Sequence, residues 1–168
     1  MPFRRYITVL ALAALLGGAD APSEYDVKAA FLLNFTRFVE WAAAPSPDAS
    51  LSVCVIGGDP FGQALDQTLA GEVIGNRRIT PRRLRSLEGA SCDVAYFPHA
   101  NRDTARSLAA MPPRVLTVGE GEEFLRDGGM IAFVMENRRV RFDINMAAVR
   151  QGGVRLSSRL LQVARMVK

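Results

Sequence analysis

Histidine is almost absent from these 168 residues, and its one example, His99, follows an apolar run in the segment FPHAN. A lone histidine without partner residues is more often a loop residue than a catalytic base. A serine-hydrolase triad would have to use it, yet the chain has no G-x-S-x-G elbow. No H-E-x-x-H motif and no cysteine–histidine cluster offers a zinc site. The sequence therefore predicts a protein that is not an enzyme and has neither a metal nor a cofactor.

A phosphate-binding lysine is missing from the glycine turn in VCVIGGDPFGQAL, residues 53 to 65. Gly57 and Gly62 have the spacing of a P-loop, but glutamine and alanine stand where lysine and a hydroxyl residue are required. Asp59 and Pro60 instead suggest a helix N-cap and a first helical residue. A capping carboxylate would occupy the donors that a phosphate needs. This turn is therefore interpreted as scaffold.

The first apolar run, Tyr6–Leu16, is well short of the ~20 residues that a membrane-spanning helix needs. It follows Arg4 and Arg5 and precedes a group of small residues, which is the pattern of a cleavable signal peptide. The alternatives are an uncleaved anchor and a buried first helix. We expect residues 1–21 to be the signal peptide and residues 22–168 to form one periplasmic domain.

The excess of positive charge is small. The formal net charge is +4, and removal of the two leader arginines would lower it by two. Such a charge does not indicate nucleic-acid binding, so no nucleic-acid partner is predicted. Hydrophobic residues at 49% and charged residues at 23% are ordinary values for a globular domain.

Cysteine occurs only twice, as Cys54 and Cys92. In an oxidising compartment two cysteines tend to pair. Cys54 lies inside the apolar run LSVCVIG, and Cys92 begins the run CDVAYFP. If these runs are neighbouring strands, their Cα atoms lie ~5 Å apart, which a disulfide can bridge. The alternative is two free, buried thiols that pack as small hydrophobic groups.

The order of the predicted elements indicates the fold class. A helix is expected in SEYDVKAAFLLNFTRFVEW, with Ser23 as its N-cap. Buried strands are expected at Leu51–Ile56, Val94–Phe97, Val115–Val118 and Met130–Met135, alternating with helices at Phe61–Leu69, Arg102–Ala110 and Glu122–Arg126. Continuous apolar strands separated by helices are typical of a parallel sheet covered on both faces. The prediction is an α/β fold, a three-layer α/β/α sandwich with a mainly parallel sheet and an antiparallel C-terminal hairpin.

That hairpin is predicted from a change of pattern. In Val140–Ile144, apolar residues alternate with Arg141 and Asp143, which indicates a strand exposed on one face. We expect it to pair antiparallel with Met130–Met135 and to hold Arg141 and Asp143 on its less buried side. The last segment, SSRLLQVARMVK, is expected to be a helix with Arg165 in its final turn.

Four residues are candidates for contact with a protein partner. Trp41 is the one tryptophan and follows an apolar helix face, so it is either a residue at the rim of the core or an exposed anchor. Arg138, Arg139 and Arg159 either form a solvated face or bind a partner.

Four segments carry a resemblance to a known family. EYDVKAAFLLNFTRFVEW, CVIGGDPFG, CDVAYF and GGMIAFVMENRRVRFDINMAAVRQGGVRLSSRLLQVAR follow one another between Glu24 and Arg165. In this order they resemble the YfiR family of periplasmic regulators. The resemblance implies an α/β fold, a Cys54–Cys92 disulfide and a role in cyclic di-GMP signalling and biofilm regulation. Characterised members repress an inner-membrane diguanylate cyclase by binding its periplasmic sensory domain. They carry a second cysteine pair that this chain lacks, so redox switching through that pair is not implied here.

Two functional hypotheses follow. The first is a non-catalytic, redox-sensitive repressor whose partner is a diguanylate cyclase or another inner-membrane sensor protein, with a homodimer as a further possibility. The second is a periplasmic small-ligand sensor that uses the crevice at the carboxyl ends of the parallel strands.

Overall fold

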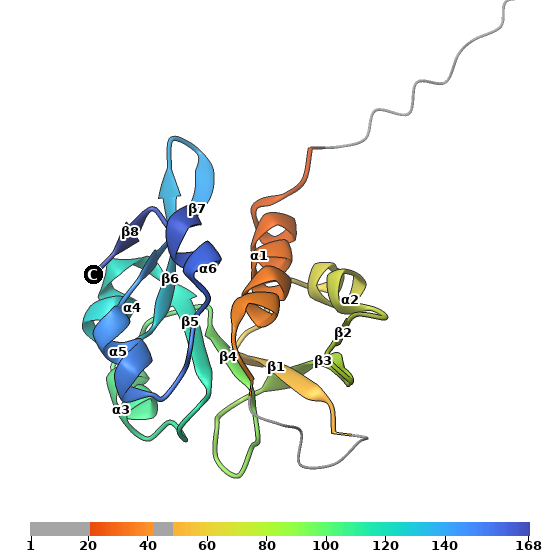
Figure 1. The fold of residues 1–168 in the computed structure, drawn as a ribbon, viewed down its shortest axis with the longest axis horizontal. Helices are drawn as coiled ribbons and strands as arrows, with labels where there is room; N and C mark the ends of the chain where they lie inside the picture. The colour runs from red at the N-terminus through yellow and green to blue at the C-terminus, as the bar shows by residue number, and fades with distance from the viewer. Residues whose placement is uncertain (1–20, 42–48) are drawn as a thin grey trace, which may run out of the picture.

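The computed structural model describes residues 21–41 and 49–168, which form one sheet with helices on its two faces (Figure 1). The strand order is β2-β3-β1-β4-β5-β6-β7-β8. Residues 1–20 of the predicted signal peptide, and residues 42–48, lie outside the described residues.

The strands are β1 (Leu51–Ile56), β2 (Val73–Ile74), β3 (Arg77–Leu84), β4 (Val94–Phe97), β5 (Leu116–Glu120), β6 (Ile131–Glu136), β7 (Arg139–Ile144) and β8 (Met166–Val167). The helices are α1 (Glu24–Phe38), α2 (Gln63–Leu69), α3 (Thr104–Ala109), α4 (Gly121–Arg126), α5 (Met146–Gln151) and α6 (Ser158–Val163).

The central strands are parallel, as predicted. β3, β1, β4, β5 and β6 pair in parallel, whereas β2 pairs antiparallel with β3 and β7 pairs antiparallel with β6. The predicted fold class is confirmed. Because the chain runs from β1 to β3 on one side and later returns to β4 on the other, the strand order reverses between β1 and β4.

Two hydrophobic clusters lie on opposite faces of the sheet. The larger one packs α1, α2, α5 and α6 against the sheet, and the smaller one packs α3 and α4 against the other face. Aromatic rings pack between the layers. The ring centroids of Phe35 in α1 and Phe142 in β7 are 4.9 Å apart, and those of Phe97 in β4 and Phe124 in α4 are 5.6 Å apart. Burial of such a side chain contributes about 1.5–3 kcal/mol, so these contacts hold the layers together.

The predicted helix start at Ser23 is confirmed. The Ser23 hydroxyl accepts a hydrogen bond from the backbone N–H of Asp26, and the Asp26 carboxylate accepts one from the N–H of Ser23. This capping box satisfies two donors at the start of α1, the longest helix of the described chain. The hydrogen bonds from Ser23 also lower the pKa of Asp26.

Asp59 does not cap a helix, which corrects the sequence prediction. α2 begins four residues later at Gln63, after Gly62. One oxygen of Asp59 accepts the N–H of Phe61 at 2.9 Å, and the other accepts from Nε of Arg83 at 2.9 Å. The arginine of β3 draws the carboxylate away from the helix end. The glycine turn remains a scaffold, held by an ion pair rather than by a cap.

Four elements were not predicted: β2, β3, α5 and β8. β3 is built from RRITPRRL, whose many arginines hide the strand pattern, and it forms because β1 offers a complete row of backbone partners. α5 begins at Met146 after Asn145, whose side chain accepts the N–H of Ala148. The predicted last helix ends at Val163, and the chain then forms β8 beside β7.

Asp143 lies on a more buried side of β7 than predicted. The antiparallel pairing with β6 is confirmed, with Phe133 opposite Phe142, and Arg141 is half-buried. Asp143, however, is 0% exposed. Nε of Arg165 donates to its carboxylate at 2.8 Å, and a second guanidinium nitrogen donates to its other oxygen. The early end of α6 brings Arg165 over β7, so the buried charge has a partner.

Candidate partner-binding surface

The β6–β7 hairpin extends beyond the helices at one end of the molecule (Figure 1). Asn137 and Arg138 form its two-residue turn, and their φ angles of 50° and 60° are those of a type I′ turn. Asparagine tolerates this left-handed conformation, and glycine is the usual second residue. Arginine at the second position costs about 1–2 kcal/mol. The hairpin therefore holds Arg138 in a strained conformation.

Basic side chains gather on this hairpin. Arg138 and Arg139 are exposed, and neither has an ion-pair partner within the described part of the chain. Met135, on the other strand of the hairpin, is 53% exposed. The hairpin thus presents two guanidinium groups and one large apolar side chain to solvent.

The other two predicted contact residues lie apart from the turn. Arg159 is exposed in the first turn of α6, beside the N-cap Ser157. Trp41 follows α1, whose C-terminal end lies far from the hairpin tip (Figure 1). Its indole N–H donates to the carbonyl of Thr36 at 2.7 Å, and its ring packs against the larger core. Trp41 is therefore a rim residue of the core, and the structure does not bring it together with the arginines.

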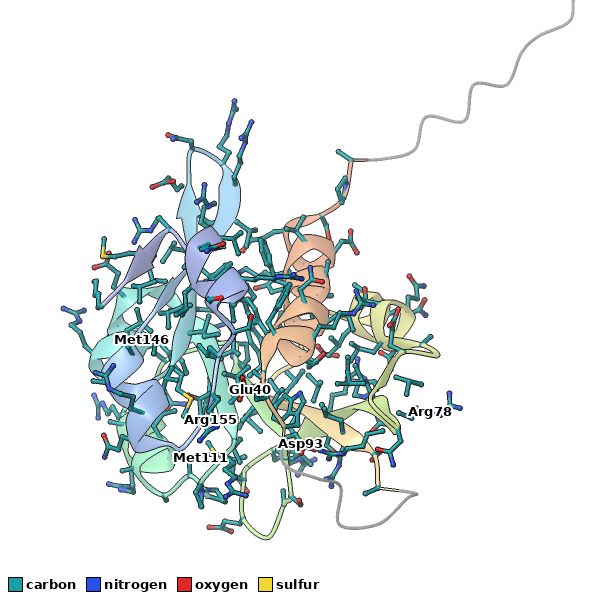
Figure 2. All side chains as sticks on the ribbon, viewed as in Figure 1. Glu40, Arg78, Asp93, Met111, Met146 and Arg155 are labelled. Atoms are coloured by element: carbon teal, nitrogen blue, oxygen red, sulfur yellow. A yellow bond between two sulfur atoms is a disulfide. The ribbon has the colours of Figure 1, made fainter. Side chains whose placement is uncertain are left out.

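A groove of about 500 Å³ lies beside Trp41. Two arginines that the sequence patterns did not single out, Arg114 and Arg155, line it. Arg155 lies 3.8 Å from Glu40, and the two are labelled together near the end of α1 in Figure 2. Arg114 has a positive φ of 66°. Because Arg114 precedes β5, this groove lies at the amino ends of the parallel strands rather than at the carboxyl ends.

The carboxyl ends of β4 and β5 hold a buried charge cluster. Lys28 of α1 is 2% exposed, and its ammonium group donates to Glu120 at 2.8 Å and also to Glu24. The hydroxyl of Tyr96 donates to the other oxygen of Glu120. Burial raises the pKa of Tyr96, and the Glu120 carboxylate raises it further, so this hydroxyl stays protonated. These hydrogen bonds and ion pairs link α1 to the carboxyl ends of β4 and β5.

Lys28 is held in its charged form. Burial alone would lower its pKa, but the hydrogen bonds with Glu120 and Glu24 together outweigh burial and raise it above 10.5. A raised pKa in the folded state means that the ion pairs contribute their full stability below pH 10.5. That contribution is lost as the pH rises through the pKa of the folded state.

We expect Lys28→Met to lower the free energy of unfolding by about 2–3 kcal/mol at neutral pH, because Glu120 would lose its buried cation. Urea denaturation measures the change. The matched control is Glu24→Gln, which removes a carboxylate that is 43% exposed and should cost less than about 1 kcal/mol. The difference between wild type and Lys28→Met should shrink above pH 10.5. Equal stability of the two proteins at neutral pH would contradict the role of this cluster.

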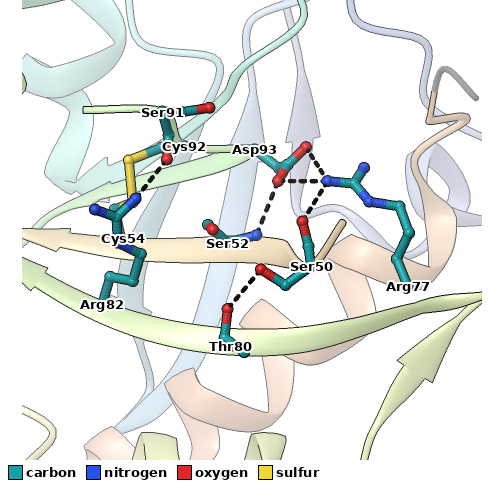
Figure 3. Close-up of a disulfide and its surroundings, with 9 residues drawn as sticks. All are labelled: Ser50, Ser52, Cys54, Arg77, Thr80, Arg82, Ser91, Cys92 and Asp93. Atoms are coloured by element: carbon teal, nitrogen blue, oxygen red, sulfur yellow. Dashed lines mark hydrogen bonds and ion pairs between the residues drawn. A yellow bond between two sulfur atoms is a disulfide. The ribbon is translucent and has the colours of Figure 1, made fainter. Parts of the chain in front are cut away.

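Figure 3 shows the disulfide between Cys54 of β1 and Cys92, which lies two residues before β4. The two Cα atoms are 6.0 Å apart, and Cys54 is fully buried. Asp93 accepts hydrogen bonds from the backbone N–H of Ser52 and from the guanidinium group of Arg77, both at 2.8 Å. The covalent bond and these polar contacts together fix the start of β4 against β1.

None of the helices in the part of the chain that the structure describes is long and apolar enough to cross a membrane. Within residues 21–41 and 49–168, no group of three or more acidic, cysteine or histidine residues could hold a metal ion. Glu120 forms an ion pair with Lys28, and Glu122 forms one with Arg165.

These features define a three-layer α/β domain with a disulfide between adjacent parts of its sheet. The chain belongs to the YfiR/HmsC-like family, whose model matches residues 25–165. Members of this family are in general periplasmic regulators. The resemblance noted in the sequence is thereby confirmed.

A solved structure supports the fold. The crystal structure of a conserved domain protein from Vibrio cholerae O1 biovar El Tor matches with a TM-score of 0.57 and 12% sequence identity. The match covers 87% of this chain and 60% of the Vibrio protein. At this identity the likeness concerns the fold alone.

Proposed function

We propose that this protein is a non-catalytic periplasmic regulator that binds the periplasmic sensory domain of an inner-membrane diguanylate cyclase and represses it. The observation that carries the proposal is the match of residues 25–165 to the YfiR/HmsC-like family. Residues 22–168 would be the mature regulator, released from its signal peptide.

The surface of the protein is compatible with this role. Arg138, Arg139 and Arg159 are exposed on the hairpin and on α6, so they can contact a partner without any rearrangement of the core. Trp41 is half-buried, so it would contribute only the exposed part of its ring. Arginine and tryptophan are both enriched among the residues that dominate binding energy at interfaces.

The decisive experiment has a biochemical and a cellular arm. The mature chain is immobilised and exposed to detergent-solubilised membranes from its own bacterium, and the retained proteins are identified by mass spectrometry. We expect a diguanylate cyclase with a periplasmic sensory domain to be retained. Deletion of the gene should raise cellular cyclic di-GMP. Retention of no cyclase, together with an unchanged cyclic di-GMP level, would overturn the proposal.

A second candidate function, small-ligand sensing, is favoured by the groove beside Trp41. Its volume of about 500 Å³ suits a small molecule, and Arg114 and Arg155 would attract an anionic one. This location differs from the carboxyl-end crevice that the sequence suggested. A screen of small periplasmic anions by thermal shift, with Arg155→Ala as the control, tests it. A hit that stabilises the wild type but not the variant would favour the sensor.

A further inference from the structure

We propose that the β6–β7 hairpin is the element by which this regulator docks on its partner, and that the receiving site is an acidic protein surface with an apolar slot for Met135. This inference rests on the proposed function and adds to it the docking element and the chemistry of the partner site. Strain, charge and apolar exposure on the hairpin carry it.

The first observation is the strain at the turn. A two-residue type I′ turn requires a positive φ at both of its positions. Asparagine, as at position 137, adopts this conformation readily, and glycine adopts it without strain. Arg138 has a φ of 60°, so the turn would form with less strain if glycine stood at this position. Strain of this kind persists mainly at functional sites. The arginine at this position serves something other than the fold.

The second observation is the distribution of charge around the hairpin. Three carboxylates close to the hairpin share one cation: Arg165 contacts Asp143, Glu122 at 3.4 Å and Glu136 at 3.8 Å. Glu136 lies opposite Arg139 in the strand pairing, but among the described residues neither Arg138 nor Arg139 forms an ion pair with a carboxylate. A guanidinium group pairs with a carboxylate through two parallel hydrogen bonds. The complementary surface is therefore acidic.

The third observation is Met135. It is 53% exposed and lies opposite Val140, which is buried. A methionine side chain is flexible and polarizable, so it fills apolar slots of irregular shape on a partner. Directly opposed residues of a strand pair share a face, so Met135 lies on the face of Val140, whereas Arg139 points to the other face. A partner that encloses the hairpin tip would therefore meet an apolar side chain on one face and charged groups at the turn and on the other face.

A protein surface fits these features better than an anionic lipid surface. A lipid surface is fluid and gives no advantage to a side chain that starts from a fixed, strained backbone. Each arginine near such a surface strengthens binding only roughly fivefold, whatever its backbone conformation. A shape-specific site on a protein, in contrast, gains from a guanidinium group whose direction is already set.

The test is Arg138→Gly, which separates folding from binding. Glycine relieves the positive φ, so the thermal midpoint should rise by about 2–4 °C. Affinity for the sensory domain retained by the wild type, measured by calorimetry, should fall about tenfold or more, because the contact between the guanidinium group and a carboxylate of the partner is lost. An unchanged or lower midpoint would contradict the strain at this position and overturn the inference.

Three controls make the result specific. Asn137→Gly changes the same turn but keeps the arginine, so binding should be retained. Arg102→Ala removes an exposed arginine from the loop before α3 and should change affinity less than about twofold. Met135→Ser should weaken binding as Arg138→Gly does. The wild type should not bind vesicles of phosphatidylglycerol and phosphatidylethanolamine, and vesicle binding that Arg138→Gly abolishes would overturn the inference in favour of lipid.

The two proposals fail in different ways. If the wild type binds a cyclase domain and Arg138→Gly binds it equally well, the hairpin proposal is wrong and the proposed function stands. If the wild type retains a different membrane protein and Arg138→Gly loses it, the hairpin proposal stands and the cyclase assignment is wrong. If the wild type retains no membrane protein and deletion of the gene leaves cellular cyclic di-GMP unchanged, both are overturned.

Discussion

Replacing Arg165 with methionine is expected to lower the free energy of unfolding by about 2–4 kcal/mol, because the carboxylate of Asp143 would stay buried without a cation. Asp143 is 0% exposed, and the Arg165 guanidinium group donates to both of its oxygens. Methionine keeps most of the aliphatic length of the side chain, so the loss would be mainly electrostatic. Urea denaturation, monitored by circular dichroism, measures the change.

Two variants separate the buried charge from simple loss of contact. Asp143→Asn combined with Arg165→Met leaves a neutral amide in place of the carboxylate, so it should recover part of the lost stability. Glu122→Gln removes a carboxylate that is 60% exposed and should change stability by less than about 0.5 kcal/mol. If Arg165→Met unfolds at the same urea concentration as the wild type, the ion pair is not what stabilises this edge of the sheet.

This ion pair also shows where sequence reasoning reached its limit. Alternation along Val140–Ile144 correctly indicated a strand paired with β6, because strand side chains point to opposite faces in turn. The same alternation placed Asp143 on an open face. It could not reveal that Arg165, from a segment expected to be helical, covers that face. Burial at a sheet edge depends on which distant segment arrives there, and a local pattern does not contain that information.

The central strands were predictable for a physical reason. β1 and β4 are buried along nearly their whole length, so their sequences are continuously apolar and stand out. β3 lies near the sheet edge, with several arginines, and has no such signature. β3 forms through backbone pairing with β1, and side-chain patterns in a sequence carry little information about such pairing.

The candidate site was only partly accessible to the same reasoning. The exposure of Arg138, Arg139 and Arg159 follows from their charge and was expected. The positive φ at Arg138 could not be foreseen, because the turn lacks the Asn-Gly or Asp-Gly pair that normally announces a type I′ turn. The separation of Trp41 from these arginines depends on the length and direction of α1 across the sheet.

The double variant Cys54→Ala/Cys92→Ala is expected to lower the free energy of unfolding by ~3–4 kcal/mol. The disulfide closes a loop with a sequence separation of 38, and the figure follows from the loop entropy that it removes from the unfolded chain. A domain of ordinary stability has only about 5–15 kcal/mol in total. Loss of the bond would therefore leave a much larger unfolded fraction. Thermal and urea denaturation of the oxidised wild type and the variant measure this change.

The same bond gives a reducing cue a route to de-repression, if the protein acts as the repressor proposed above. Cys54 is fully buried and Cys92 is half-buried, so reduction would act through the exposed side of the bond and then loosen the contact between β1 and β4. A repressor destabilised in this way would release its partner by losing its fold. Reductant should lower the melting temperature and partner binding of the wild type together and leave the melting temperature of the double variant unchanged. If the double variant melts where the oxidised wild type does, the bond does not govern stability. If reductant abolishes binding without changing the melting temperature, the bond instead acts locally on the interface, and the unfolding route is wrong.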